Sequence, residues 1–482
     1  MTASGPPASF AARARAALGD DRLRQALGKA TALFAARRRT ALAEVPDWEE
    51  LRQRAARIKR EALNGLHHYL EQFAANAETA GAEIHWARDA AEACAIVSSI
   101  ARRIGARHLV KAKSMTTEEI GLNAALERDG RLPVETDLGE WIIQLAGEPP
   151  SHIIVPAIHK SRADVAALFA AELGIPPTDD VAELTRAARV ALRQRFAAAE
   201  LGISGVNFAV AETGSILILE NEGNARMATT LPRVHVAIVG IEKIVPRFEH
   251  LAVFLRLLPR SGTGQHLTTY QSILTGPSAI VGDEGPEELH IVLLDNGRTA
   301  MLASDETRPA LACIRCGACL NACPVYREIG GHAYGSTYPG PIGAVITPLL
   351  AGLERGGDLA FASSLCGACR EVCPVDIDLP GLLIELRSRV VEGRRRGELA
   401  GGRAAAFERR AIATWAWAMA SPRRYRLLSR LARALPGPWR RGGRPGRLAA
   451  RLIPALRAWG AARDLRPLAP RTFRDLWRED EG

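Results

Sequence analysis

The stretch Cys313-Ile-Arg-Cys316-Gly-Ala-Cys319-Leu-Asn-Ala-Cys323-Pro324 has the spacing C-x2-C-x2-C-x3-C-P. A second run, Cys366-Gly-Ala-Cys369-Arg-Glu-Val-Cys373-Pro374, repeats the pattern with Ser363 in place of its first cysteine. Seven of the eight cysteines of the chain lie in these two runs. The spacing is typical of bacterial ferredoxins with two iron–sulfur clusters, in which the fourth cysteine of a run ligates the other cluster.

This reciprocal rule divides the seven cysteines into two ligand sets. The first cluster takes Cys313, Cys316, Cys319 and Cys373, and the second takes Cys323, Cys366 and Cys369. Ser363, a side chain from elsewhere, or a cluster with one iron fewer would complete the second set. Soft thiolates suit such irons, whereas zinc sites use paired C-x2-C knuckles. The sequence therefore predicts two 4Fe–4S clusters, unless the second is a 3Fe–4S cluster or carries a ligand other than cysteine.

The composition is that of a globular chain with a basic end. The chain has 482 residues, of which 47% are hydrophobic. This length suits two to four domains of roughly 100–200 residues each. No apolar run reaches the ~18 residues of a membrane span, and the N-terminus lacks the apolar core of a secretory signal, so we expect a cytoplasmic protein. Residues 401–482 hold nineteen arginines and six acidic residues, a net charge of +13, whereas the whole chain carries +10.

The pattern of apolar residues changes along the chain. Residues 1 to about 80 carry apolar residues at helical spacing. From about 80 to 300, short β-branched runs alternate with helical segments, which predicts an α/β domain with a largely parallel sheet. We expect strands at 83–86, 108–111, 153–155, 205–210, 216–219 and 235–239, and helices at 90–104 and 179–199. Around and between the cysteine runs we expect helices.

Polar clusters follow several of the predicted strands. Open α/β sheets bind ligands beyond the carboxyl ends of their strands, so these clusters are a candidate ligand pocket. Turn chemistry explains the same residues equally well, because Asn, Gly and Thr suit tight turns. No G-x-G-x-x-G follows a strand and no Walker lysine loop is present, so a nucleotide is not indicated. The pocket candidates are Glu135, Asp137, Glu212, Thr213, Asn221, Glu222 and Asn224, with Glu140 and Gly240-Ile-Glu242-Lys243 nearby in the pattern.

The segment from about 400 onward combines arginine with tryptophan. It holds Trp415, Trp417, Trp439, Trp459 and Trp477. Arginine with tryptophan suits a protein partner or an anionic membrane surface, and charge alone would also suit nucleic acid. We expect a partner subunit, because an electron carrier must dock, and we do not expect nucleic acid. A solvated basic tail is the alternative.

The chain resembles the lactate utilization protein B family over nearly its whole length. The resemblance rests on Ala211-Glu-Thr-Gly-Ser215, on Asn221-Glu-Gly-Asn224, on the helical entry with Trp48, and on both cysteine runs with the same cysteine missing. It implies a lactate-utilization (LUD) α/β domain, with a sheet similar to the ribose-phosphate isomerase and coenzyme A transferase group, and an α-helical ferredoxin domain. The expected domains are N-terminal helices (1–75), the LUD domain (76–300), the ferredoxin domain (301–395) and an Arg/Trp-rich helical tail (396–482).

The resemblance also implies a function. It points to an iron–sulfur electron-transfer subunit of a bacterial L-lactate oxidation system, which would relay electrons through two 4Fe–4S clusters as lactate becomes pyruvate. The implied partners are other subunits of that system, including a cysteine-rich iron–sulfur subunit and a second LUD protein, with peripheral membrane contact through the basic tail as an option. Two alternatives stay open. In the first, the LUD domain is itself a catalytic or ligand-binding module. In the second, the chain is an iron–sulfur adaptor for a different dehydrogenase.

Overall fold

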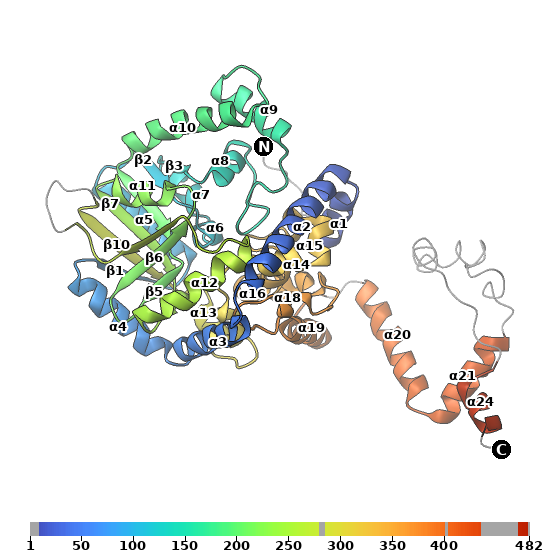
Figure 1. Cartoon of the computed structure of the whole chain (residues 1–482). Coiled ribbons are helices and arrows are strands. Elements are labelled where there is room, and N and C mark those ends of the chain that lie inside the picture. The colour runs from blue at the N-terminus through green and yellow to red at the C-terminus, as the bar shows by residue number, and fades with distance from the viewer. Residues whose placement is uncertain (1–8, 279–284, 401–402, 435–470, 481–482) are drawn as a thin grey trace. The chain divides into compact units, whose positions relative to one another are not determined.

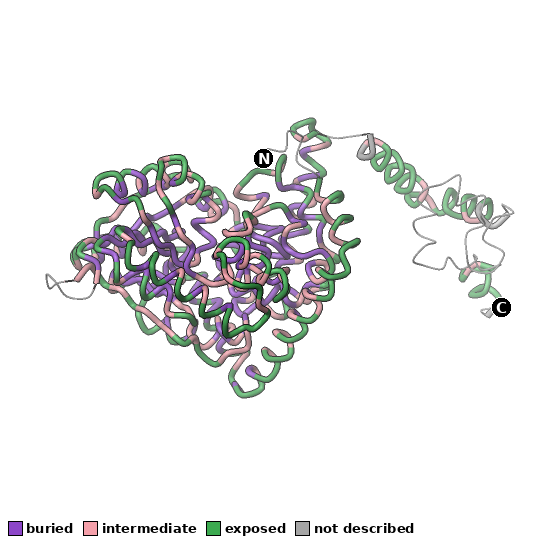
Figure 2. Tube along the Cα trace, turned by 90° about the horizontal axis from the view of Figure 1, so that it is seen from above, coloured by how far each residue is buried: buried purple, intermediate pink, exposed green. Residues whose placement is uncertain are grey.

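The computed structural model describes residues 9–278, 285–400, 403–434 and 471–480. The chain divides into two units, Met1–Leu399 and Ala400–Gly482. The larger unit holds every described strand and both cysteine runs (Figure 1). Its buried residues gather in the interior, whereas the described helices of the smaller unit are mostly exposed (Figure 2).

A six-stranded, fully parallel sheet organises the larger unit, which confirms the expected α/β class with a parallel sheet. Alternate residues of a strand face opposite sides. Val236 and Ile238 pack against α5 (Ala90–Arg103), while Ala237 and Val239 pack on the side of α4 (Leu66–Thr79). Both faces are therefore covered, as parallel sheets require. The strand order is β1 (Glu83–Ala87), β10 (Glu288–Leu294), β7 (Val234–Gly240), β4 (Leu201–Gly205), β2 (His108–Lys111) and β3 (Leu132–Glu135).

A second, four-stranded sheet is partly antiparallel. Its order is β8 (Ile244–Val245), β5 (Phe208–Val210), β6 (Ser215–Glu220) and β9 (Tyr270–Leu274). The turn between β5 and β6 needs a glycine, because Gly214 has a φ of 69° and a Cβ there would lie 2.3 Å from the backbone nitrogen of Ala77. The Ala211–Ser215 motif thus forms a tight hairpin that packs against α4.

Helices make most of the remaining connections, and two predicted strands are wrong. The strand predicted at 205–210 is divided between the end of β4 and β5, which belong to different sheets. Residues 153–155 form no strand, because Pro149 and Pro150 precede them and Pro156 follows. The amides of Ile154 and Val155 instead donate to Nδ1 of the buried His152, at 3.0 and 3.2 Å. The connecting helices are α6 (Met115–Glu119), α7 (Leu122–Arg128), α8 (Leu138–Leu145), α9 (Arg162–Leu173), α10 (Val181–Ala198), α11 (Asn224–Thr230), α12 (Leu251–Gly262), η1 (Ile241–Lys243) and η2 (Phe248–His250).

The cysteine-rich segment is helical and shares its core with the rest of the larger unit. Helices α1 (Phe10–Leu18), α2 (Asp21–Ala43) and α3 (Trp48–Asn64) return to it, and α2 lies beside α14 and α15 (Figure 1). Leu27 of α2, Ile58 of α3 and Phe254 of α12 belong to one buried cluster with Cys316 and Cys319. The segment comprises α13 (Arg298–Leu302), η3 (Arg308–Ala312), α14 (Ala318–Ala322), α15 (Pro324–Ile329), η4 (His332–Tyr334), α16 (Gly340–Ala351), α17 (Leu353–Gly356), η5 (Gly357–Phe361), α18 (Ala368–Glu371) and α19 (Leu379–Arg396).

The smaller unit presents apolar side chains to solvent. Its described helices are α20 (Arg403–Met419), α21 (Pro422–Ala434) and α24 (Phe473–Asp480). Phe407 is 76% exposed and Trp415 is 61% exposed. Trp439 and Trp459 of the predicted partner surface lie outside the described residues. Among the helices that are described, none has the length and apolarity needed to cross a membrane.

Candidate iron–sulfur site and ligand pocket

The structure brings the first predicted ligand set together. Burial raises the pKa of the Cys319 thiol, and the charges of Cys313, Cys316 and Cys373 raise it further. Helix α14, which carries Cys319, packs against α18 of the second cysteine run. Three of the four residues are buried and Cys313 is half-buried. The loop before α14 and the end of the second cysteine run therefore meet, as the reciprocal rule predicts.

The second set also gathers, at a more open place. Burial and then the charge of Cys323 raise the pKa of Cys369 to about 11, and Cys366 adds to the effect. Cys323 and Cys369 are buried, whereas Cys366 is exposed. The second group of thiols is therefore more open to the protein surface than the first.

Ser363, which replaces the missing cysteine, is engaged in a turn. Its Oγ accepts a hydrogen bond from the amide of Leu365 at 3.1 Å, and Leu365 has a left-handed φ of 55°. The neighbouring side chain of Ser364 hydrogen-bonds the Cys366 sulfur and lowers the pKa of that thiol, after the larger effect of the Ala368 amide. The Ser364 hydroxyl therefore lies at the second group, whereas the recorded partner of the Ser363 hydroxyl is the Leu365 amide.

Backbone amides point at the sulfur atoms of both groups. Such N–H···S bonds disperse the charge of a bound cluster and tune its potential. One donor is Ile342, at the start of α16, which hydrogen-bonds Cys319. It follows the glycine- and proline-rich segment that ends at Pro341. The donor–acceptor distances are 3.4 Å from Arg315 N to Cys313 Sγ, 3.5 Å from Tyr326 N to Cys323 Sγ and 3.3 Å from Ile377 N to Cys373 Sγ.

The donor geometry fits iron–sulfur clusters better than zinc or disulfides. All eight cysteines are free thiols. In the part of the chain that the structure describes, no three cysteine sulfurs lie within 4.8 Å of one another. A tetrahedral zinc site with bonds of about 2.3 Å would place them about 3.8 Å apart.

Arginines from the N-terminal helices hold the second cysteine run in place. Arg52 of α3 donates from Nε to the carbonyl of Cys373 at 2.7 Å and pairs with Asp376 at 2.5 Å. Arg38 of α2 donates to the carbonyl of Val372 at 3.2 Å. These guanidinium groups also place positive charge beside the thiolates, which favours the anionic ligands that a cluster needs.

A buried network of charges joins the cysteine-rich segment to the α/β part. The Arg315 guanidinium lies 3.4 Å from Glu242 and 4.6 Å from the ring centroid of Tyr338. Arg298 pairs with Glu242 at 2.5 Å and with both oxygens of Glu119 at 2.8 and 2.9 Å, and the Tyr338 hydroxyl donates to Glu119 at 2.6 Å. Although burial opposes it, the charges of Arg298 and Arg315 lower the pKa of Glu242 to about 2.

A cavity of about 450 Å³ lies beyond the carboxyl ends of β2, β4 and β7, where open α/β sheets bind ligands. Four of the predicted pocket residues line it: Asp137, Asn221, Glu222 and Asn224. Asp137 caps α8 by accepting from the amides of residues 139 and 140 at 3.0 and 3.1 Å. Glu222 accepts from the amide of residue 138 at 3.1 Å. Burial and then the charge of Asp137 raise the pKa of Glu222 to about 7.

The other predicted pocket residues do not line this cavity. Glu135 pairs with the buried Lys111 at 2.7 Å. Glu212 accepts from the amide of residue 248 at 2.8 Å, and Thr213 donates to Ser215 at 2.8 Å within the hairpin turn. Glu140 is buried, and burial followed by the charge of Glu135 raises its pKa well above the usual range. Turn and helix-end chemistry accounts for Glu212 and Thr213.

Cations also line the cavity, and of Lys113, Lys243 and Arg315 the sequence pattern points only to Lys243. Lys113 follows β2, Lys243 ends η1, and Arg315 enters from between two cysteines of the first run. A lysine directly after a strand was a visible signal for Lys113. The direction of the Arg315 side chain was not, because it depends on the left-handed φ of 60° at that residue and on tertiary packing.

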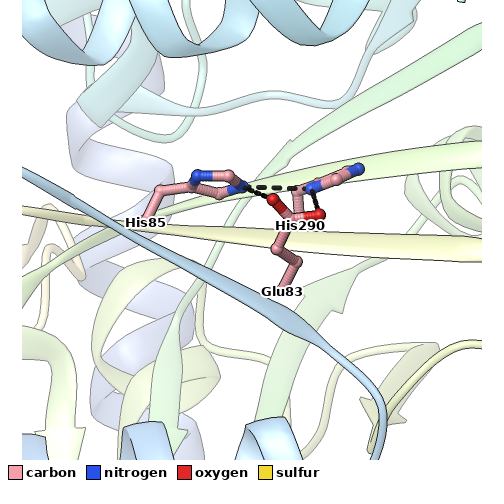
Figure 3. A group of neighbouring side chains, drawn as sticks. All are labelled: Glu83, His85 and His290. Atoms are coloured by element: carbon pink, nitrogen blue, oxygen red, sulfur yellow. Dashed lines mark hydrogen bonds and ion pairs between the residues drawn. The ribbon is translucent and has the colours of Figure 1, made fainter.

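A third group of metal-ligand type lies away from both cysteine groups. Glu83, His85 and His290 point toward one another from β1 and β10 (Figure 3). His85 Nε2 lies 3.0 Å from His290 Nδ1, and Nε2 of His290 lies 3.1 Å from Glu288 and 3.1 Å from Arg103. These interactions join the edge strand β1 to β10.

Comparison with known proteins matches three families along the chain. A LUD domain model matches residues 70–294, a 4Fe-4S dicluster domain model matches residues 309–377, and a model for the lactate utilisation protein B C-terminal region matches residues 385–481. The first two matches cover the α/β part and the segment with both cysteine groups, respectively.

Relatives match over nearly their whole length. Lactate utilization protein B of Bacillus licheniformis is 41% identical over 98% of this chain and 96% of its own, and that of Shouchella clausii is 42% identical over 98% of both. An uncharacterized electron transport protein of Escherichia coli, YkgF, is 43% identical over 98% and 97%. A crystal structure of a DUF162 family protein from Deinococcus radiodurans is 15% identical, with a TM-score of 0.25 over 48% of this chain and 98% of its own, which is too distant to bear on the fold.

Proposed function

Because the chain belongs to the lactate utilization protein B family, we propose that it is the iron–sulfur electron-transfer subunit of a bacterial L-lactate oxidation system. The observation that carries the proposal is the gathering of seven free cysteines into two groups within the 4Fe-4S dicluster match. Two 4Fe–4S clusters, once bound, would supply one-electron transfer. Their ligands would be Cys313, Cys316, Cys319 and Cys373 for the first, and Cys323, Cys366 and Cys369 for the second.

The protein's own residues would set the order and access of the two centres. Three of the four thiols of the first group are buried, whereas the exposed Cys366 leaves the second group within reach of a partner. Backbone amides at Cys313, Cys323 and Cys373 stabilise negative charge. The second group is therefore the better candidate for electron exchange with another subunit.

The finer assignments of fold and partners belong to the same proposal. We infer that the six-stranded sheet is of the ribose-phosphate isomerase and coenzyme A transferase type. We also infer that the partners include a cysteine-rich iron–sulfur subunit and a second LUD protein. The exposed Phe407 and Trp415 of α20 supply apolar contacts, and the arginines of the same tail supply cationic ones. Interfaces between proteins use both kinds.

Iron analysis tests the ligand sets. Purified anaerobically and reconstituted, the chain should hold about eight irons and eight sulfides, as two four-iron clusters require. Cys319→Ala and Cys369→Ala should each remove about half of the iron, because each breaks one set. Cys94→Ala is the matched control, because its thiol donates to the carbonyl of Ile120 at 3.5 Å and lies in neither group. Reconstituted protein without iron would end the proposal.

The second centre needs a separate test of its fourth ligand. Electron paramagnetic resonance of the oxidised and reduced protein separates a three-iron from a four-iron cluster. Ser363→Ala should leave a three-iron signal unchanged, whereas a serine-ligated four-iron cluster should lose an iron. Ser363→Cys would complete the cysteine pattern and should favour four irons.

A second candidate function is an adaptor for a different dehydrogenase. The name of the Escherichia coli relative mentions electron transport and no electron donor. The arrangement of the cysteines does not depend on which compound donates the electrons. Co-purified with its partner subunits, the protein should reduce a dye with L-lactate as the electron donor. Reduction by another hydroxy acid but not by lactate would favour the adaptor.

A further inference from the structure

In the cavity beside the first thiol group, the acidic side chains have hydrogen-bond partners, whereas the cationic side chains have fewer. Its carboxylates serve the protein itself: Asp137 caps α8, and Glu222 and Glu220 accept backbone amides at the starts of α8 and α11. The cations have fewer partners. Lys243 is only 7% exposed and makes no hydrogen bond or ion pair with any residue that the structure describes.

A second cationic donor faces the same space. Arg315 gives one nitrogen to Glu242 at 3.4 Å, but its buried Nη1 has no partner within the described chain. The buried Oγ1 of Thr268, also in the cavity wall, is likewise unpartnered. Leaving a buried polar group without a partner costs up to several kcal/mol, and leaving a buried ammonium without one costs more. A functional role, or a water, ion or ligand that completes them, accounts for such groups in folded proteins.

The remaining walls decide what kind of anion would fit. A guanidinium edge matches a carboxylate or a phosphate. The apolar wall favours an organic anion with a carbon skeleton over a bare inorganic ion. The volume of about 450 Å³ is at the small end for ligand pockets, which run to roughly 300–1,000 Å³. The apolar lining residues are Phe34, Met115, Ile154, Ile218 and Leu258.

We propose that this cavity is a binding site for a small organic carboxylate, held by Lys243 and Arg315. The inference deepens the proposed function and rests on it in one respect. Arg315 lies between Cys313 and Cys316, so an anion paired with its guanidinium would lie next to the first cluster. The bound carboxylate would then change the electrostatic environment of that cluster, and the LUD part of the chain would report ligand occupancy to the redox centre.

Isothermal titration calorimetry of the full-length holoprotein tests the site with pyruvate, L-lactate and inorganic phosphate as probes. We expect saturable binding of at least one carboxylate and weaker binding of phosphate. Lys243→Met should weaken carboxylate binding at least tenfold, about the effect of 1.4 kcal/mol. Lys29→Met, on the exposed face of α2, should leave it unchanged. Absence of carboxylate binding, tighter binding of phosphate, or unchanged binding by the Lys243 variant would overturn the proposal.

Stability separates a binding role from a structural one. Without ligand, Lys243→Met should melt no lower than the wild type, because it removes an unpaired buried charge. A lower melting temperature would mean that Lys243 supports the fold, which would also overturn the proposal. Thr268→Val gives a second variant, expected to weaken binding while keeping the fold.

The link to the cluster has its own readout. Pyruvate at saturation should alter one electron paramagnetic resonance signal of the reduced wild-type protein and none in Lys243→Met. Binding without any spectral change would overturn the link between the cavity and the cluster. Iron is counted on the same samples. If the cluster assignment is wrong, iron is missing; if the binding site is wrong, iron is present but the titration shows no heat of binding.

Discussion

Replacing Arg298 with methionine should destabilise the protein more than almost any other single charge removal. Arg298 is 1% exposed and bridges two carboxylates, those of Glu119 and Glu242, whose side chains are 6% and 1% exposed. The same network reaches the cysteine-rich segment through Arg315 and Tyr338. The substitution keeps an unbranched apolar stem and removes the guanidinium with its charge and its donors.

The magnitude follows from what stays behind. Removing one partner of a buried ion pair costs about 3–5 kcal/mol, because an uncompensated charge is left in the interior. Two carboxylates lose Arg298, but Glu242 keeps Arg315 and Glu119 keeps the Tyr338 hydroxyl. We therefore expect a loss of about 3–5 kcal/mol in the free energy of unfolding near neutral pH rather than twice that value.

The loss should also depend on pH in a defined direction. In the wild type the pKa of Glu242 is lowered to about 2, so its contribution is complete above the unfolded value of about 4.5 and disappears as the pH falls toward 2. In the variant the buried carboxylates can escape their charge only by binding protons. The difference between wild type and variant should therefore shrink on acidification.

Urea unfolding under anaerobic conditions, followed by far-UV circular dichroism at about pH 7 and about pH 4, measures both effects. The matched control is Arg233→Met. Arg233 pairs with Glu287 at 2.6 Å, but its side chain is 80% exposed, so its removal should change the stability little. A loss of less than 1 kcal/mol for Arg298→Met, or one that grows as the pH falls, would refute the assigned role of the network.

Three further substitutions, the first with Gly28→Ala as its control, test the packing around the cysteines and the sheet. Gly262→Ala should lower stability by about 1–3 kcal/mol and reduce iron content, because its Cβ would lie 2.7 Å from a backbone oxygen of the first cysteine run. In Gly28→Ala the new Cβ would have no atom within 4 Å, so the free energy of unfolding should rise by up to about 1 kcal/mol. His235→Asn should flatten the loss of stability between about pH 7 and pH 5, since burial, with the charge of a neighbouring histidine, lowers the pKa of His235 to about 3 and stability falls as the pH drops below the unfolded value of about 6.5. Arg52→Met removes the donor to the Cys373 carbonyl, so a chelator should strip iron faster from the variant than from the wild type.

The amino-acid pattern predicted more of the α/β part than of its loops. The strand at 108–111 and the helix at 90–104 agree with β2 and α5 to within one residue. The strand predicted at 153–155 is wrong. Periodicity recognises the apolar run, but it does not register the flanking prolines or the His152 side chain that accepts hydrogen bonds from two of the amides. The pocket prediction located Asp137 and Glu222 through their place after strands, but it could not separate them from hairpin residues such as Glu212.

The sequence by itself determined the iron–sulfur character, the family and the α/β class, because cysteine spacing and apolar periodicity are local properties of the chain. Only the tertiary structure decided which arginines stand beside the thiols, that Cys366 reaches the surface, and that Lys243 and Arg315 share a cavity. Those relations depend on side chains from α2, η1 and the first cysteine run meeting in space. Neither spacing nor propensity encodes such meetings, since they follow from how the helices and the sheet pack into one core.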